Sequence, residues 1–188
     1  MLKMSSNTVN VRQNLKSILD KLSSIYSESP EVSRAVKIPR LVAVSKTKPK
    51  EMIVEAYEAG QRHFGENYVQ EMADKAADSL LLEKCPDIKW HFIGTVQSNK
   101  VAKIVKSPNL TVVETVASQK LADKFQSSCK SNNVSNLGIM IQVQFDKLFC
   151  CNFICYVFVN LKKSSFSLSF RLTHLEKKIR AELNLLKS

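Results

Sequence analysis

Glycine and proline are scarce in this sequence, and their distribution is uneven. All four glycines and all five prolines lie before Phe145, whereas six of the nine phenylalanines and three of the five cysteines lie from Phe145 onward. Turns between strands and helices depend on glycine and proline, so the last part of the chain lacks the residues that a further strand–helix unit needs. We therefore divide the chain into residues 1–144 and a Phe-, Cys-, Ser- and Lys-rich tail, 145–188.

Motifs for several common kinds of site are also missing. The five cysteines include no CxxC pair and no histidine at ligand spacing, which argues against zinc or any other metal site. Their odd number, with three crowded into residues 150–155, does not fit a secreted disulfide framework and favours a reducing compartment. Neither GxGxxG nor GxxxxGK[ST] occurs, so the usual nucleotide fingerprints are absent.

The sequence offers little for membrane insertion or export. Its N-terminus has no apolar core of the kind found in a secretory signal. The longest apolar run, 148–161, is 14 residues, against the roughly 20 that a membrane-spanning helix requires. We expect a cytoplasmic protein; a mitochondrial location stays open, because the N-terminus is basic, Ser-rich and free of acidic residues before Asp20.

The net charge of +11 would favour anionic partners, but much of it is local. Eight basic and three acidic residues follow Gln144, so the tail holds +5 and the first 144 residues hold the remaining +6. That excess is modest, and we predict no nucleic-acid binding and no membrane partner. Binding of RNA or vesicles through the tail is the competing hypothesis, and deletion of the tail would test it.

Apolar runs and helical patterns alternate along the first 144 residues. An amphipathic helix over 11–25 comes first. Strands are predicted at 41–45, 61–66, 88–94, 110–116 and 138–144, with helices at about 50–59, 68–83, 100–106 and 119–130 between them. This order predicts an α/β fold with a parallel sheet. A doubly wound sheet and a (β/α)8 barrel both satisfy it, and the missing nucleotide fingerprints favour the barrel.

Ligands of parallel α/β folds bind beyond the carboxyl ends of the strands. Lys46 follows the first strand, where partial desolvation would lower its pKa and make its amine nucleophilic. The alternative is a solvated lysine beside Lys48 and Lys50. Asn67, after the second strand, either donates to a ligand or caps the next helix. His63 and His91, within strand patterns, are interpreted as hydrogen-bonded core histidines.

Three motifs go further. AVSKTKP (43–49), GQRHFGENYVQE (60–71) and KWHFIGTVQSNK (89–100) closely resemble the pyridoxal phosphate homeostasis proteins. The resemblance implies a (β/α)8 barrel of the alanine racemase N-terminal kind, with Lys46 forming a Schiff base with pyridoxal 5′-phosphate and Asn67 near that cofactor. It also implies a monomeric cofactor carrier without established turnover, serving PLP-dependent apo-enzymes, with no catalytic residues.

The chain also departs from that family. The resemblance ends at about Gln144, after the first five βα units, whereas a complete barrel needs about 250 residues and usually binds phosphate after strands seven and eight. We therefore expect an incomplete barrel that folds poorly and binds the cofactor weakly. It would come from a truncated or alternatively spliced product, or from a gene model that reads through an intron. The alternatives are a PLP-dependent amino-acid racemase-like enzyme, or a non-functional truncated product with a basic tail.

Overall fold

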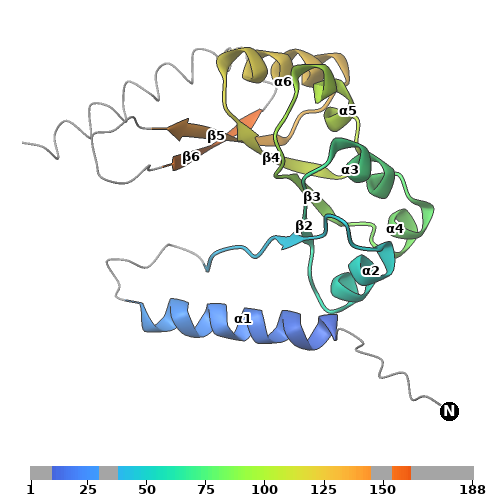
Figure 1. Ribbon diagram of the computed structural model, residues 1–188, viewed down its shortest axis with the longest axis vertical. Coiled ribbons are helices and arrows are strands. Elements are labelled where there is room, and N and C mark those ends of the chain that lie inside the picture. Colours follow the sequence, from blue (N-terminus) through green and yellow to red (C-terminus); the bar gives the residue numbers. More distant parts are fainter. Residues whose placement is uncertain (1–9, 30–37, 145–153, 162–188) are drawn as a thin grey trace, which may run out of the picture.

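The computed structural model describes residues 10–29, 38–144 and 154–161. Its centre is a six-stranded sheet in the order β1-β2-β3-β4-β5-β6 (Figure 1). The strands are β1 (Ala43–Val44), β2 (His63–Glu66), β3 (Lys89–Phe92), β4 (Leu110–Val116), β5 (Leu137–Gln144) and β6 (Ile154–Leu161). The helices are α1 (Val11–Glu28), α2 (Lys50–Glu58), α3 (Val69–Ala76), α4 (Ser79–Lys84), the 3-10 turn η2 (Ser98–Lys100), α5 (Val101–Val105) and α6 (Gln119–Ser131).

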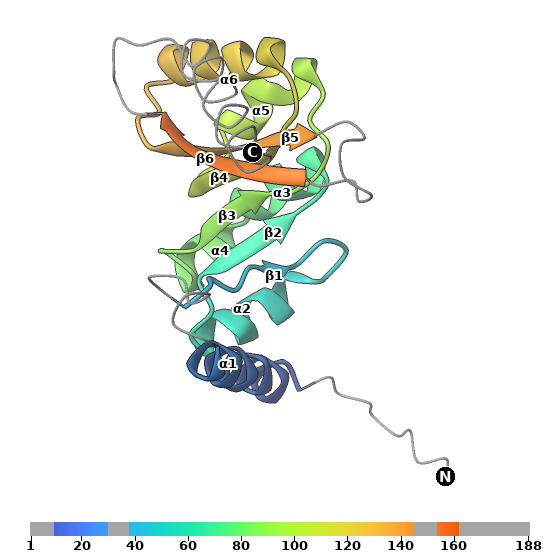
Figure 2. The ribbon, with the colours of Figure 1, turned by 90° about the vertical axis from the view of Figure 1, so that its left-hand side faces the viewer.

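The first five strands pair in parallel, each with the next along the chain. Figure 2 shows α2 to α6 on the far side of the sheet, with the opposite face turned to the viewer. We call that opposite face the inner face. The predicted α/β class with a parallel sheet is confirmed, while the incomplete (β/α)8 barrel remains a prediction; β1 and β6 are the outer strands of the described sheet.

The core lies between the sheet and the helices. Phe64, Trp90 and Phe92 point from β2 and β3 into this layer, and each is at most 2% exposed. The apolar faces of α3, α5 and α6 pack over the centre of the sheet, and those of α2 and α4 over its β1 side. Burial of one such side chain stabilises the fold by about 1.5–3 kcal/mol, so this layer fixes where the strand ends lie.

Two predicted elements differ from the structure. The helix expected over 68–83 is two helices, because the Asp78 carboxylate accepts the amides of Leu80 and Leu81 and starts α4. The first strand is two residues long instead of five, and Val44 on it is 50% exposed. The reason is its edge position, with a described partner strand on one side only.

The sheet extends past Gln144. β6 pairs antiparallel with the whole of β5, from Leu137↔Leu161 to Gln144↔Ile154, so the chain reverses here instead of adding a parallel unit. The sequence interpretation contained no strand in this region. Residues 173–188, whose sequence also fits an amphipathic helix, lie outside the described residues, and the boundary at 144/145 stays a prediction. No helix within the described ranges is both long and apolar enough to cross a bilayer.

Candidate functional site

Lys46 lies in the turn that follows β1. The β1–β2 ladder continues one residue beyond the strand, because the Ser45 amide donates to the Gly65 carbonyl at 2.9 Å. Side chains alternate between faces along such a segment: Ala43 packs under the helices, Val44 is exposed on the inner face, and Ser45 is buried. Lys46 comes next and lies in the turn. Its side chain is exposed, so the expected partial desolvation was wrong, again because β1 lies at the edge.

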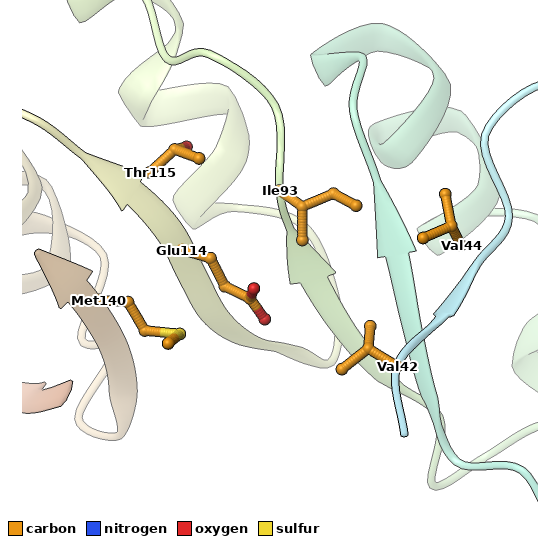
Figure 3. Close-up of a pocket in the computed structure, with 6 residues that line it drawn as sticks. All are labelled: Val42, Val44, Ile93, Glu114, Thr115 and Met140. Carbon is orange, nitrogen blue, oxygen red and sulfur yellow. The ribbon is translucent and has the colours of Figure 1, made fainter. Parts of the chain in front are cut away.

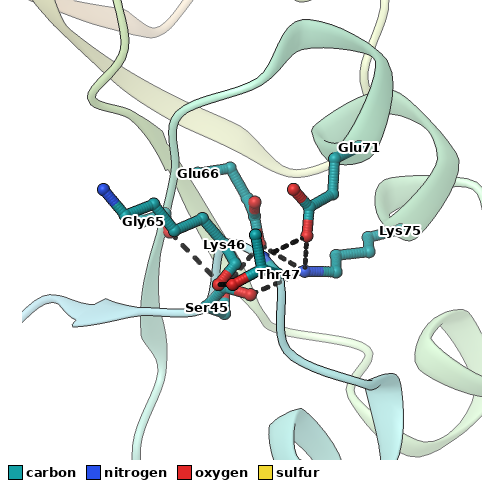
Figure 4. A network of polar contacts seen from close by, with 7 residues as sticks. All are labelled: Ser45, Lys46, Thr47, Gly65, Glu66, Glu71 and Lys75. Atoms are coloured by element: carbon teal, nitrogen blue, oxygen red, sulfur yellow. Dashed lines mark hydrogen bonds and ion pairs between the residues drawn. The ribbon is translucent and has the colours of Figure 1, made fainter.

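A polar network lies beneath this turn (Figure 4). The Glu66 carboxylate is fully buried, and its Oε1 accepts from Ser45 Oγ at 2.7 Å and from Lys75 Nζ at 2.8 Å. Burial raises the pKa of Glu66, although the bonds from Lys75 and Ser45 act in the opposite direction. Figure 4 shows the Lys46 amine pointing away from these carboxylates, so the network leaves Lys46 available.

Helix α3 supplies the other members of the network. Lys75 Nζ also donates to Glu71 Oε1 at 2.7 Å and to the Ser45 carbonyl at 2.7 Å, and the Thr47 amide donates to Glu71 Oε1 at 2.6 Å. The sequence interpretation missed Glu71 and Lys75. Their i,i+4 spacing on a predicted helix indicates an ion pair, but not that the pair contacts the turn after β1, 24 to 30 residues away along the chain.

The inner face carries a hollow of about 290 Å³, shown in Figure 3. It is lined by Val42, Val44, Ile93, Glu114, Thr115 and Met140. Gly65 contributes to its shape, because a Cβ at this position would lie 3.1 Å from Ile93 Cδ1 and 3.2 Å from Val42 Cγ1. The hollow is mainly apolar with one carboxylate, and Lys46 lies two residues after Val44 along the chain. An apolar wall with few polar groups is typical of small-molecule sites.

Glu114 is the end of a hydrogen-bonded chain across three strands. His63 Nδ1 lies 2.8 Å from His91 Nε2, and His91 Nδ1 lies 2.7 Å from Glu114 Oε1. His91 is 3% exposed. The interpretation as a hydrogen-bonded core histidine is confirmed for His91, whereas His63 is hydrogen-bonded but only partly buried. Within the described ranges, no cluster of three or more His, Cys, Asp or Glu side chains is arranged to hold a metal ion.

His63 makes the fold sensitive to acid. Burial first, then the charges of Arg40, His91 and Lys89, lower the pKa of His63 from 6.5 to about 4. Because the folded state favours the neutral ring, we expect the free energy of unfolding to decrease as the pH falls from about 6.5 to about 4, by at most about 3 kcal/mol. Urea unfolding at a series of pH values should show this slope, and His63→Asn should flatten it. Equal slopes in the two proteins would contradict the assignment.

Asn67 follows β2, at the same carboxyl end of the parallel strands as Lys46. Helix α3 begins with Tyr68 as its N-cap and without a side-chain cap bond, so capping by Asn67 is not what the structure shows. The Asn67 Oδ1 atom is buried and has no hydrogen-bond partner among the described residues. Beside it is a second hollow, of about 350 Å³. Its lining comprises Asn67, Tyr68, Val69, Gln70, Thr95, Gln97, Lys100 and Lys103.

Comparison with known proteins agrees with the motifs. No family model matches the chain. Over 130 residues it is 47% identical to the pyridoxal phosphate homeostasis protein of Bos taurus, covering 69% of this chain and 47% of that protein. The chain is homologous to the pyridoxal phosphate homeostasis proteins. The Homo sapiens member is 47% identical with the same coverage, and the Vibrio cholerae member is 40% identical over 71% of this chain and 54% of its own length.

Two solved structures also resemble this chain. PipY of Synechococcus elongatus with PLP bound aligns with a TM-score of 0.51 and 36% identity, over 72% of this chain and 57% of PipY. An unknown protein from Bifidobacterium adolescentis aligns with a TM-score of 0.57 and 28% identity, over 67% and 52%. The resemblance to the pyridoxal phosphate homeostasis proteins is thus confirmed, and the chain spans about half the length of the curated relatives it matches.

Proposed function

We propose that this chain binds pyridoxal 5′-phosphate through Lys46 and takes part in intracellular homeostasis of that cofactor. The observation that carries the proposal is the position of Lys46, an exposed residue at the carboxyl end of β1, two residues after Val44, which lines the hollow. Homology to proteins named for pyridoxal phosphate homeostasis gives the ligand class. When bound, the cofactor supplies an aldehyde that condenses reversibly with a lysine amine.

The residues present fit the aldehyde and the ring of this ligand. Lys46 offers the amine, the hollow beside Val44 offers an apolar wall for a ring, and Asn67 Oδ1 is a buried acceptor that has no donor among the described residues. The network of Ser45, Glu66 and Lys75 holds the backbone from which Lys46 projects. These contacts support binding and orientation, and we assign the chain a carrier role, as a monomer that serves PLP-dependent apo-enzymes in the cytoplasm.

The described residues fit the phosphate group of the cofactor less well. In (β/α)8 barrels a phosphate usually sits in the loops after strands seven and eight, and the six described strands include no such loops. We therefore propose weak, readily reversible attachment of the cofactor to this chain. Such a protein would exchange cofactor easily, as a buffer requires.

The test is covalent trapping. The purified chain is incubated with pyridoxal 5′-phosphate, reduced with borohydride and digested, and the modified lysine is identified by mass spectrometry. We expect the label on Lys46 and its loss in Lys46→Ala, while Lys48→Ala and Lys50→Ala keep it. Label spread evenly over the surface lysines, or unchanged in Lys46→Ala, would refute the proposal. Formation of D-alanine from L-alanine by the loaded protein would instead favour the racemase alternative.

A further inference from the structure

The turn that carries Lys46 has a backbone that needs support. It runs from Ser45 to Lys48 and is closed by the Lys48 amide, which donates to the Ser45 carbonyl at 3.0 Å. Its third residue, Thr47, has a φ of 59°, in the left-handed region. Turns of this kind favour glycine or asparagine at that position, because a side chain with a Cβ crowds the backbone there. A threonine in this conformation persists only where its surroundings hold it.

Two side chains of helix α3 form hydrogen bonds with the backbone on both sides of Lys46. Glu71 Oε1 accepts the Thr47 amide at 2.6 Å, and Lys75 Nζ donates to the Ser45 carbonyl at 2.7 Å. The two side chains are joined to each other at 2.7 Å. Both neighbours of Lys46 are therefore tied to one helix, while its own side chain points away from them (Figure 4).

The charge on Glu71 favours this arrangement at neutral pH. Burial by itself would raise the pKa of Glu71, but the bonds from Lys75 and from the Thr47 amide outweigh it and lower the pKa below its ordinary value. Hydrogen bonds to an ionised group are stronger than those between neutral groups. Side-chain exposures of 24% for Glu71 and 12% for Lys75 keep the pair largely away from water.

We propose that Glu71 is a positioning residue, which together with Lys75 clamps the Ser45–Lys48 turn and fixes the direction in which the Lys46 amine projects. This inference rests on the proposed function, in that Lys46 is the reacting amine. Glu71 acts through the backbone and does not touch the ligand. Holding one reacting group in place is worth a large factor in rate, because the chain does not have to find that geometry during the reaction.

The experiment compares Glu71→Ala and Glu71→Gln with the wild-type chain. Two quantities are measured: hydrogen exchange of the Thr47 amide without ligand, and the rate at which pyridoxal 5′-phosphate with borohydride labels Lys46. In Glu71→Ala we expect faster exchange and roughly tenfold slower labelling, the size of effect that one hydrogen bond to a charged group produces. Glu71→Gln keeps an acceptor oxygen and should recover part of both.

Glu51 provides the matched control. It is an exposed acid in the first turn of α2, so Glu51→Ala removes the same charge from a neighbouring helix. It should leave both measurements unchanged, and the unfolding free energy of each variant shows that it is folded.

The outcomes separate the two proposals. Absence of label on wild-type Lys46 overturns the proposed function, and the Thr47 exchange then decides the clamp alone. Wild-type exchange at Thr47 in Glu71→Ala overturns the clamp. Faster exchange together with unchanged labelling of Lys46 overturns the positioning role.

Discussion

Gly94→Ala is expected to lower the free energy of unfolding by about 3 kcal/mol, at the upper end of the overpacking range. A Cβ at residue 94 would lie 1.9 Å from the carbonyl oxygen of Asn67 and 2.6 Å from its carbonyl carbon. Both atoms are backbone, so no side-chain rotation relieves the clash, and the segments that follow β2 and β3 would have to separate. The same shift would displace Asn67, so the variant should also alter the carboxyl end of the sheet, where we propose that the cofactor binds.

Gly60→Ala is the control for this prediction. Gly60 has a φ of 101°, and no atom lies within 4 Å of the position that a Cβ would take, so alanine there meets backbone strain without a clash. We expect a loss of about 1–2 kcal/mol. Trp90, the single tryptophan, is 1% exposed, and its fluorescence during urea unfolding reports both variants. Equal losses in the two variants would show that close approach at Gly94 does not limit the packing of these segments.

Lys75→Met is expected to lower the free energy of unfolding by about 3–5 kcal/mol at neutral pH, the usual consequence of removing one partner of a buried ion pair. Lys75 is 12% exposed and donates to the carboxylates of both Glu66 and Glu71. Methionine has similar length and removes the charge without leaving a large cavity. The fully buried Glu66 carboxylate would then keep only the Ser45 hydroxyl as a donor among these contacts.

The loss should depend on pH in a definite direction. Burial raises the pKa of Glu66, and Lys75 opposes that rise, so removing Lys75 raises the pKa further. A carboxyl whose folded pKa exceeds its unfolded value destabilises the fold above the unfolded value, near 4.5, and the penalty disappears as the pH falls to that value. The difference between Lys75→Met and wild type should therefore shrink on acidification.

Two further variants test the cause. Glu66→Gln in the Lys75→Met background removes the unpaired charge and should recover much of the stability. Lys50→Met breaks the more exposed pair with Asp78 and should have a much smaller effect. A pH-independent loss in Lys75→Met would mean that packing, and not charge, accounts for the effect.

The sequence alone predicted most of the elements up to β5 and the resemblance to the pyridoxal phosphate homeostasis proteins. Apolar runs at 88–94 and 110–116 match β3 and β4 closely, because a buried strand is itself a short run of apolar residues. The placement of Lys46 and Asn67 at the same end of the sheet could also be predicted, because each residue follows one of two neighbouring parallel strands. Sequence motifs also indicated the homology, which reflects ancestry and requires no knowledge of the packing.

The exposure of Lys46 and the contacts that hold its turn could be seen only in the folded chain. A run such as 41–45 predicts a strand but not whether that strand lies at an edge, because the edge depends on which other strands pair with it. The bond from Glu71 to Thr47 and the chain from His63 through His91 to Glu114 join residues 23 to 28 positions apart. Such contacts depend on strand register and on the rotation of α3 against the sheet, which long-range packing sets and local periodicity does not record.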